Sequence, residues 1–177
     1  MQISELITKG YKILKENNIS TPLLDSEVII SEIVKIDREK LIYNEKKTIS
    51  SNEIKEFFEK IKRRSTCEPV AYVLNKKPFW KNNFYVNKYT LIPRPETELM
   101  VERVLTHYRF KNLFILDVGT GSGCIILSIL KDLKNSYGIG IDTCKNAIKI
   151  ANKNAKILKI ESKVKFYHKS ISARINN

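Results

Sequence analysis

Cysteine and long apolar runs are both scarce in this sequence. The 177 residues include three cysteines, Cys67, Cys124 and Cys144, which are far apart and show neither C-x-x-C spacing nor a neighbouring histidine. Neither a disulfide framework nor a metal site is therefore expected. No apolar run reaches the roughly 20 residues of a membrane-spanning helix, and the start M-Q-I-S-E-L-I-T-K-G lacks the basic and then apolar layout of a signal peptide. We therefore expect a cytoplasmic protein that has no membrane partner.

Acidic residues are few in the second half of the chain. The net charge is +13, from 32 Lys and Arg against 19 Asp and Glu, and nearly all of the excess lies after residue 75. A basic field attracts acidic partners such as RNA. However, no stretch interleaves basic and aromatic residues as a nucleic-acid-binding surface does. Direct binding to nucleic acid is therefore not expected, and we attribute the charge to a composition rich in lysine.

Residues 1 to 75 have the periodicity of short helices. Apolar residues between Ile3 and Leu14 fall on one helical stripe. Further along, Ser50 and Glu53 have the spacing of a capping box, and apolar residues follow at the i, i+3, i+4 and i+7 positions. The sequence therefore predicts an N-terminal helical domain over residues 1–75.

After residue 75 the pattern changes twice. Short aromatic and β-branched runs predict a β-hairpin over residues 76–93 that links two domains. From residue 94 onward, apolar strands alternate with helices, which predicts an α/β domain over residues 94–177 with a parallel sheet. The expected strands and helices, in chain order, are 114–118, 124–133, 137–141, 146–158 and 164–167. Ligands of such sheets bind beyond the carboxyl ends of the strands.

Three glycines alternate directly after the first of these strands. Gly119, Gly121 and Gly123, with Thr120 and Ser122 between them, form the loop G-T-G-S-G before a predicted helix. Glycine permits positive φ and a close approach of ligand to backbone, and a helix start presents unpaired N–H groups. A tight turn without a ligand does not need three glycines. We therefore predict that these five residues bind a cofactor.

The spacing of the glycines narrows the class of ligand. A dinucleotide fingerprint requires G-x-G-x-x-G, but position 124 is cysteine, and no G-K-S/T follows to make a Walker loop. The next strand ends in Asp142, where a carboxylate can accept hydrogen bonds from two ribose hydroxyls. A strand-ending aspartate also commonly caps the following helix. The loop together with Asp142 nevertheless favours a nucleoside-containing cofactor.

The pattern D-x-G-x-G-x-G, followed by an acidic strand end, resembles Rossmann-like S-adenosylmethionine-dependent methyltransferases. In that class the loop passes under the methionine part of the cofactor and the acid holds the ribose. The bacterial release-factor glutamine methyltransferases share three further segments with this chain in order and spacing: E-P-V-A-Y at 68–72, F-W at 79–80 and L-I-P-R-P-E-T-E at 91–98. A-N-K-N-A at 151–155 is also similar to that family's helix after the acidic strand. The resemblance implies a substrate-docking helical domain, S-adenosylmethionine as cofactor and class 1 peptide chain release factors as partners.

The chain departs from that family at three places. Cys67 and Asn75 stand where the family has glycine, so two strained turns are expected. Ser170 and Ile171 stand where the family has an acidic or amide residue followed by an aromatic one, which implies that Ser170 hydrogen-bonds adenine and Ile171 packs against it. Asn-Pro-Pro-Tyr, which holds the substrate amide in this family, occurs nowhere in the sequence. We therefore predict an incomplete methyltransferase domain with no catalytic residue and reduced or absent activity.

Two other functions stay open on the sequence. A non-catalytic remnant would bind a release factor or a ribosomal component through its helical domain and basic half. A methyltransferase for amino groups of nucleic acids or ribosomal proteins would share the cofactor loop. The I-P-R-P-E-T-E segment favours methylation of a release-factor glutamine over the latter.

Overall fold

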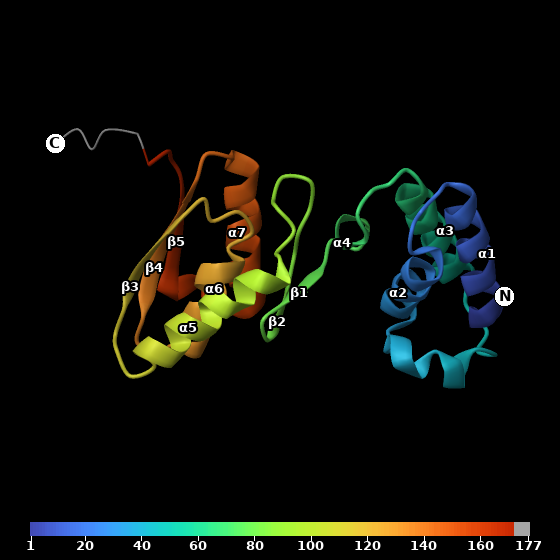
Figure 1. The fold of residues 1–177 in the computed structure, drawn as a ribbon, viewed down its shortest axis with the longest axis horizontal. Coiled ribbons are helices and arrows are strands. Elements are labelled where there is room, and N and C mark those ends of the chain that lie inside the picture. The colour runs from blue at the N-terminus through green and yellow to red at the C-terminus, as the bar shows by residue number, and fades with distance from the viewer. Residues whose placement is uncertain (172–177) are drawn as a thin grey trace. The chain divides into compact units, whose positions relative to one another are not determined.

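The computed structural model describes residues 1–171. These residues form two compact units, of which the first is Met1–Leu74 and the second begins at Asn75. The first unit is helical and the second contains two β-sheets (Figure 1). In the described part of the chain no helix is both long and apolar enough to cross a membrane. The predicted division into a helical domain, a linking hairpin and an α/β domain stays a prediction.

Amphipathic helices build the first unit around one apolar core. They are α1 (Ile3–Glu16), α2 (Pro22–Val34), α3 (Ser51–Ser65) and the short α4 (Val70–Val73), with 3-10 turns at Arg38–Lys40 and Ile42–Asn44 between α2 and α3. The largest fully buried core side chains are Ile3, Leu6, Leu14, Ile29, Ile30, Phe57 and Ile61. The predicted capping box is confirmed, because Ser50 N donates to Glu53 Oε2 (3.0 Å) and Glu53 N donates to Ser50 Oγ (3.3 Å).

A buried ion pair joins α2 to α3. Arg64 Nε donates to Asp25 Oδ2 at 2.7 Å, and only 14% and 9% of the two side chains are exposed. Thr21 Oγ1 donates to the other Asp25 oxygen (3.1 Å), and Arg64 Nη1 donates to the Glu68 carbonyl (3.2 Å). The buried charges are thus paired and hydrogen-bonded, as a low-dielectric interior requires.

A polypeptide of residues 1–75 should fold by itself. The apolar residues of the first core all lie before residue 75, so none of this core is lost when the second unit is removed. We expect a helical circular-dichroism spectrum and one cooperative thermal transition. The same polypeptide with Phe57→Asp, which places a charge in the core, is the matched unfolded control. A featureless spectrum for the parent polypeptide would contradict the boundary.

The second unit starts with an antiparallel hairpin. Strand β1 (Lys77–Phe79) pairs with β2 (Asn82–Phe84), and Lys77 lies opposite Phe84. Phe79 and Phe84 are buried and their rings contact each other edge to face, with centroids 6.0 Å apart. A 3-10 turn (Pro95–Thr97) then leads into helix α5 (Glu98–Tyr108).

A parallel sheet follows, as predicted from the alternation of strands and helices. Strand β3 (Phe114–Val118) pairs with β4 (Tyr137–Asp142), which pairs with β5 (Val164–His168). The crossover helices are α6 (Cys124–Asp132) and α7 (Lys145–Leu158). Both helices pack on the same side of the sheet (Figure 1). Gly138 lets α6 lie close to the sheet, because an added Cβ would lie 2.8 Å from Ile126 Cδ1. At Gly140 an added Cβ would lie 2.5 Å from Phe166 Cδ1 on the neighbouring strand β5.

The opposite face of the sheet is apolar and open among the described residues. On β3, Phe114, Leu116 and Val118 are 72%, 58% and 48% exposed. The register places Tyr137 beside Phe114, and Tyr137 is also exposed. Parallel sheets are normally covered on both faces, so this surface, which we call the open sheet face, is unusual for a folded domain.

Candidate functional site

The glycine loop lies at the carboxyl end of the parallel sheet, between β3 and α6. All three of its glycines have positive φ: +75° at Gly119, +55° at Gly121 and +78° at Gly123. L side chains rarely adopt this conformation, whereas glycine does so without strain. The loop G-T-G-S-G can therefore turn sharply from the strand into the helix, with no side chain at its three glycines.

The glycines differ in what surrounds them. An added Cβ at Gly119 would meet nothing within 4 Å, and one at Gly121 would meet only the Gly119 carbonyl at 3.9 Å. At Gly123 it would lie 2.9 Å from Leu127 Cδ1 and 3.4 Å from Ala151 Cβ. Gly119 and Gly121 thus border open space, where a ligand can approach the backbone, whereas Gly123 allows the close packing of helices.

Four residues of the loop itself use their backbone N–H groups within the protein, whereas the unpaired N–H groups predicted from the sequence are those of the helix start. The four loop residues donate within the chain: Gly119 and Thr120 to the Ile141 carbonyl (2.9 and 3.0 Å), Gly121 to Asp142 Oδ2 (2.9 Å) and Gly123 to the Thr120 carbonyl (2.8 Å). Buried backbone donors need partners, and the end of β4 supplies most of them. The loop is therefore fixed by β4 rather than left free to wrap an anion.

Asp142 caps the start of the helix that follows it, which is one of the two roles considered for it from the sequence; the contact with ribose stays a prediction. Its Oδ1 accepts from the N–H of Cys144, the residue that precedes α7, at 2.8 Å, and its Oδ2 accepts from Gly121 N. A carboxylate has about four lone-pair positions, so each oxygen keeps one for a further donor. The side chain is half-buried beside the bare backbone of Gly121. This geometry fits a pair of ribose hydroxyls.

Asp117 is a member of the site to which sequence reasoning gave no role. Thr120 Oγ1 donates to Asp117 Oδ2 at 2.8 Å. Burial raises the pKa of Asp117, and the nearby charge of Asp142 raises it further. In the sequence, the position of Asp117 at the start of D-x-G-x-G-x-G is the feature that indicates its place in the site. Two carboxylates beside one loop give the site a negative potential, which suits a cationic ligand.

Family models and curated relatives match this chain over most of its length. Residues 5–74 match the PrmC N-terminal domain and residues 109–176 match a methyltransferase domain. Release factor glutamine methyltransferases from Buchnera aphidicola subsp. Baizongia pistaciae and Clostridium acetobutylicum are both 37% identical to it, over 89% and 93% of this chain. Through both matched segments the chain is similar to the release factor glutamine methyltransferases. It covers 57% and 58% of the lengths of those two relatives.

The two family-model matches confirm the fold class expected from the resemblance, a helical N-terminal domain followed by a Rossmann-like methyltransferase domain. A third relative, the release factor glutamine methyltransferase of Leptospira interrogans, is 36% identical over 93% of this chain and is covered over 58% of its own length. The chain thus spans about three fifths of the curated relatives it matches. Among residues 1–171, no group of three or more His, Cys, Asp and Glu side chains is arranged to hold a metal ion.

Ser170 and Ile171 lie just beyond β5. Lys169 N donates to the Asp142 carbonyl (3.0 Å), which places the end of β5 next to Asp142. His168 Nε2 lies 2.9 Å from the Thr143 carbonyl and ties the same two strand ends together. Both predicted adenine-contacting side chains are exposed. Their contacts with adenine stay a prediction.

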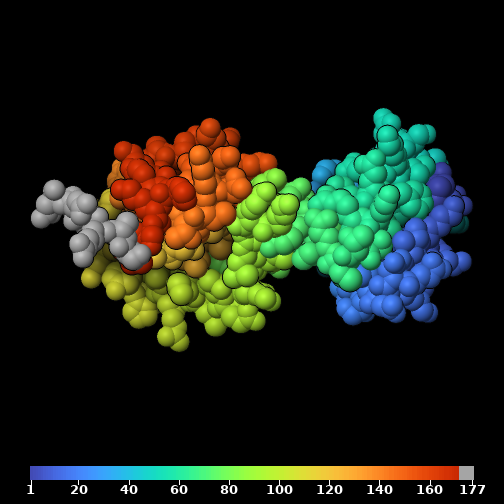
Figure 2. Space-filling view, turned by 90° about the horizontal axis from the view of Figure 1, so that it is seen from above, coloured from blue at the N-terminus to red at the C-terminus, as the bar shows by residue number. Residues whose placement is uncertain are grey.

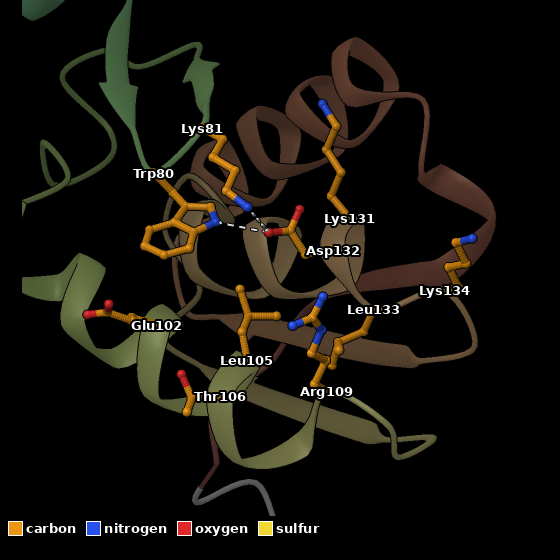
Figure 3. A pocket seen from close by; sticks show the side chains of 10 residues that line it. All are labelled: Trp80, Lys81, Glu102, Leu105, Thr106, Arg109, Lys131, Asp132, Leu133 and Lys134. Atoms are coloured by element: carbon orange, nitrogen blue, oxygen red, sulfur yellow. Dashed lines mark hydrogen bonds and ion pairs between the residues drawn. The ribbon is translucent and has the colours of Figure 1, made fainter.

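A groove of about 520 Å³ lies away from this site, between the hairpin turn, α5 and the end of α6 (Figure 3). At its rim, Lys81 Nζ and Trp80 Nε1 both contact Asp132 Oδ2, at 2.9 and 3.2 Å. Helix α6 leads from the glycine loop to Asp132, a rise of about 13 Å at 1.5 Å per residue. The groove is therefore not part of the candidate cofactor site.

Replacing Asp117 by asparagine should change how stability depends on pH. The pKa of Asp117 in the folded protein lies above its ordinary value of 3.8. At pH values between 3.8 and the folded pKa, the folded state therefore binds more protons than the unfolded state. Stability therefore falls as the pH rises through this window. An amide side chain does not titrate, so the Asp117→Asn variant should lose less stability between about pH 4 and pH 7. Urea unfolding across this range is the measurement, and parallel profiles for the two proteins would contradict the assignment.

Proposed function

We propose that these 177 residues bind S-adenosylmethionine and form the cofactor-binding part of an enzyme that methylates a glutamine side-chain amide in class 1 release factors. The observation that carries this proposal is the bare backbone at Gly119 and Gly121 beside the Asp142 carboxylate. The names of the relatives support the reaction and the substrate.

The residues at the site fit this cofactor. S-adenosylmethionine is a nucleoside with a positively charged sulfonium, which supplies the methyl group when bound. The two lone-pair positions left on Asp142 would accept its ribose hydroxyls, and the negative potential of Asp117 and Asp142 would favour its positive charge. Thr120, Ser122 and Gly123 would hold the shape of the loop, and Ser170 with Ile171 would contact the adenine.

Methyl transfer to an amide depends mainly on alignment. The nitrogen lone pair must point at the methyl carbon, and because an amide nitrogen is a weak nucleophile, its N–H groups must be held by acceptors. The resemblance to the family implies that Asn-Pro-Pro-Tyr supplies these acceptors, and this tetrapeptide is not among the 177 residues. We therefore propose that this polypeptide by itself binds cofactor without methylating glutamine.

Calorimetric titration with S-adenosylmethionine tests the cofactor site. Asp142→Ala should weaken binding by roughly 1 to 3 kcal/mol, or about 5- to 150-fold, because it removes a charged acceptor. Gly121→Val should abolish binding, because its side chain would fill the open space at a positive φ. Arg109→Ala, in the distant groove, is the matched control and should bind like the parent. Equal affinity for all four proteins would sink the site assignment.

Transfer of a labelled methyl group to a release factor tests the second part of the proposal. Cofactor binding without transfer is the expected result. Robust turnover by the 177 residues would refute the claim that they lack the acceptor-holding part. Binding of a release factor without any binding of cofactor would instead favour a non-catalytic role.

A further inference from the structure

Asn154 on α7 joins three segments that are far apart in the sequence. Its side chain is fully buried. Nδ2 donates to the Ser122 carbonyl in the glycine loop (2.8 Å) and to the Tyr85 carbonyl after the hairpin (3.0 Å), while Oδ1 accepts from the Tyr85 N–H (2.7 Å). One amide therefore connects α7, the candidate cofactor loop and the segment that leaves β2.

The partners fix the orientation of this amide. Two carbonyl oxygens face Nδ2, and only an NH₂ group carries two donors. Aspartate has the same shape but offers no donor, so it would place a carboxylate beside the Ser122 and Tyr85 carbonyls. The position is thus specific for asparagine. An Asn154→Asp substitution replaces the two hydrogen bonds that Nδ2 donates by repulsion between a carboxylate oxygen and two carbonyl oxygens.

Helix α7 contacts both the backbone and the aromatic ring of Tyr85. The hairpin ladder ends at the Lys77–Phe84 pair, and Asn154 supplies partners for both backbone groups of the next residue. The neighbouring Lys153 Nζ lies 3.2 Å from the centroid of the Tyr85 ring. In Figure 2 the yellow-green residues after the hairpin lie against the orange residues of α7. This contact fixes where the chain toward I-P-R-P-E-T-E begins.

The same helix also contacts the glycine loop. The end of β4 accepts loop N–H groups, whereas Asn154 donates to a loop carbonyl, that of Ser122. Ala151 lies one turn before Asn154 on α7. A Cβ added to Gly123 would lie 3.4 Å from the Cβ of Ala151. The loop is thus held by both β4 and α7, and α7 also contacts Tyr85.

We infer that Asn154 is a positioning residue that couples the glycine loop to the segment after the hairpin. A displacement of Tyr85 reaches Ser122 through a single side chain, and the reverse holds too. Order imposed on the loop should therefore increase order at Tyr85. The statement that cofactor binding imposes this order rests on the proposed function. The coupling itself does not depend on that function.

Amide hydrogen exchange in the 177-residue chain, measured by NMR, tests the coupling without a ligand. In Asn154→Asp, exchange should be at least tenfold faster at Tyr85 and at the loop amides of residues 119–123. Asn152→Asp is the matched control, because Asn152 is exposed on the same helix and its Nδ2 donates only to the Ile148 carbonyl of that helix. In Asn152→Asp the exchange rates at Tyr85 and at the loop amides should stay within twofold of those in the parent. Unchanged loop exchange in a folded Asn154→Asp variant would overturn the inference.

The parent protein offers a second test that does not need this variant to fold. Saturation of the parent protein with S-adenosylmethionine should shift the loop amide resonances and slow exchange at Tyr85 at least threefold. A shift in the loop with no slowing at Tyr85 would overturn the coupling. No shift in the loop would contradict the proposed function instead, and the exchange comparison between the two aspartate variants would then decide the coupling.

Discussion

Arg64→Ala should lower the free energy of unfolding of the first unit by about 3 to 5 kcal/mol. The substitution removes the charged partner of Asp25, a residue that is 6% exposed and whose side chain then keeps the Thr21 hydroxyl as a donor. A buried carboxylate without its counter-charge is far more costly than the pair itself is favourable. Urea unfolding of the whole chain, followed by helical circular dichroism, gives the measurement.

Arg38→Ala is the matched control for this prediction. Arg38 pairs with Glu27 at 3.1 Å, but 49% of its side chain is exposed, and pairs in such surroundings contribute about 0 to 1 kcal/mol. The double variant Asp25→Leu/Arg64→Met, which removes both charges, should recover most of the loss. Equal destabilisation by Arg64→Ala and Arg38→Ala would show that the Asp25–Arg64 pair has no special cost on breaking.

The 177-residue chain should self-associate through the open sheet face. Large apolar side chains on β3 are half exposed or more, and contiguous apolar surface of this kind drives association. β3 is also an outer strand of the sheet as described, so its free edge favours pairing. Sedimentation velocity at increasing protein concentration should show oligomers, and association should strengthen with salt because the net charge of +13 is then screened.

Phe114→Lys/Leu116→Lys should shift this chain to the monomer. Both side chains are exposed, so the substitutions remove apolar surface without entering the core. Ile157→Lys is the control, because Ile157 is an exposed apolar residue on α7, away from the open sheet face. It adds the same kind of charge at a different place. An equal shift for both variants would mean that net charge, rather than this face, governs association.

Local patterns in the sequence predicted the features whose partners lie nearby in the chain. The Ser50–Glu53 capping box and the alternation behind the parallel sheet are examples. The two turns at Cys67 and Asn75 are another, because both residues have positive φ, +65° and +51°, as expected where the family has glycine. Each of these features depends on backbone preferences or on neighbours within a few residues.

The features that the sequence did not reveal depend on distant partners. Asp25 and Arg64 are each ordinary surface residues by type, and only the packing of α2 on α3 buries them together. Asn154 stands in a segment that resembles a family helix, but nothing local in the sequence indicates that it contacts Tyr85 and Ser122. The end of β4 accepts from the N–H groups of Gly119, Thr120 and Gly121, and no local pattern in the loop indicates this contact.

The register of the parallel sheet affects the order in which the chain folds during synthesis. β3 pairs Phe114 with Tyr137, and β4 pairs Gly138 with Val164. At about 5 to 20 residues per second, each strand waits roughly 1 to 5 s for its neighbour to leave the ribosome. The helical first unit is complete by then, because its core ends before residue 75. During this interval β3 exposes apolar side chains and an unpaired backbone, so it is a segment that a chaperone could bind before the sheet forms.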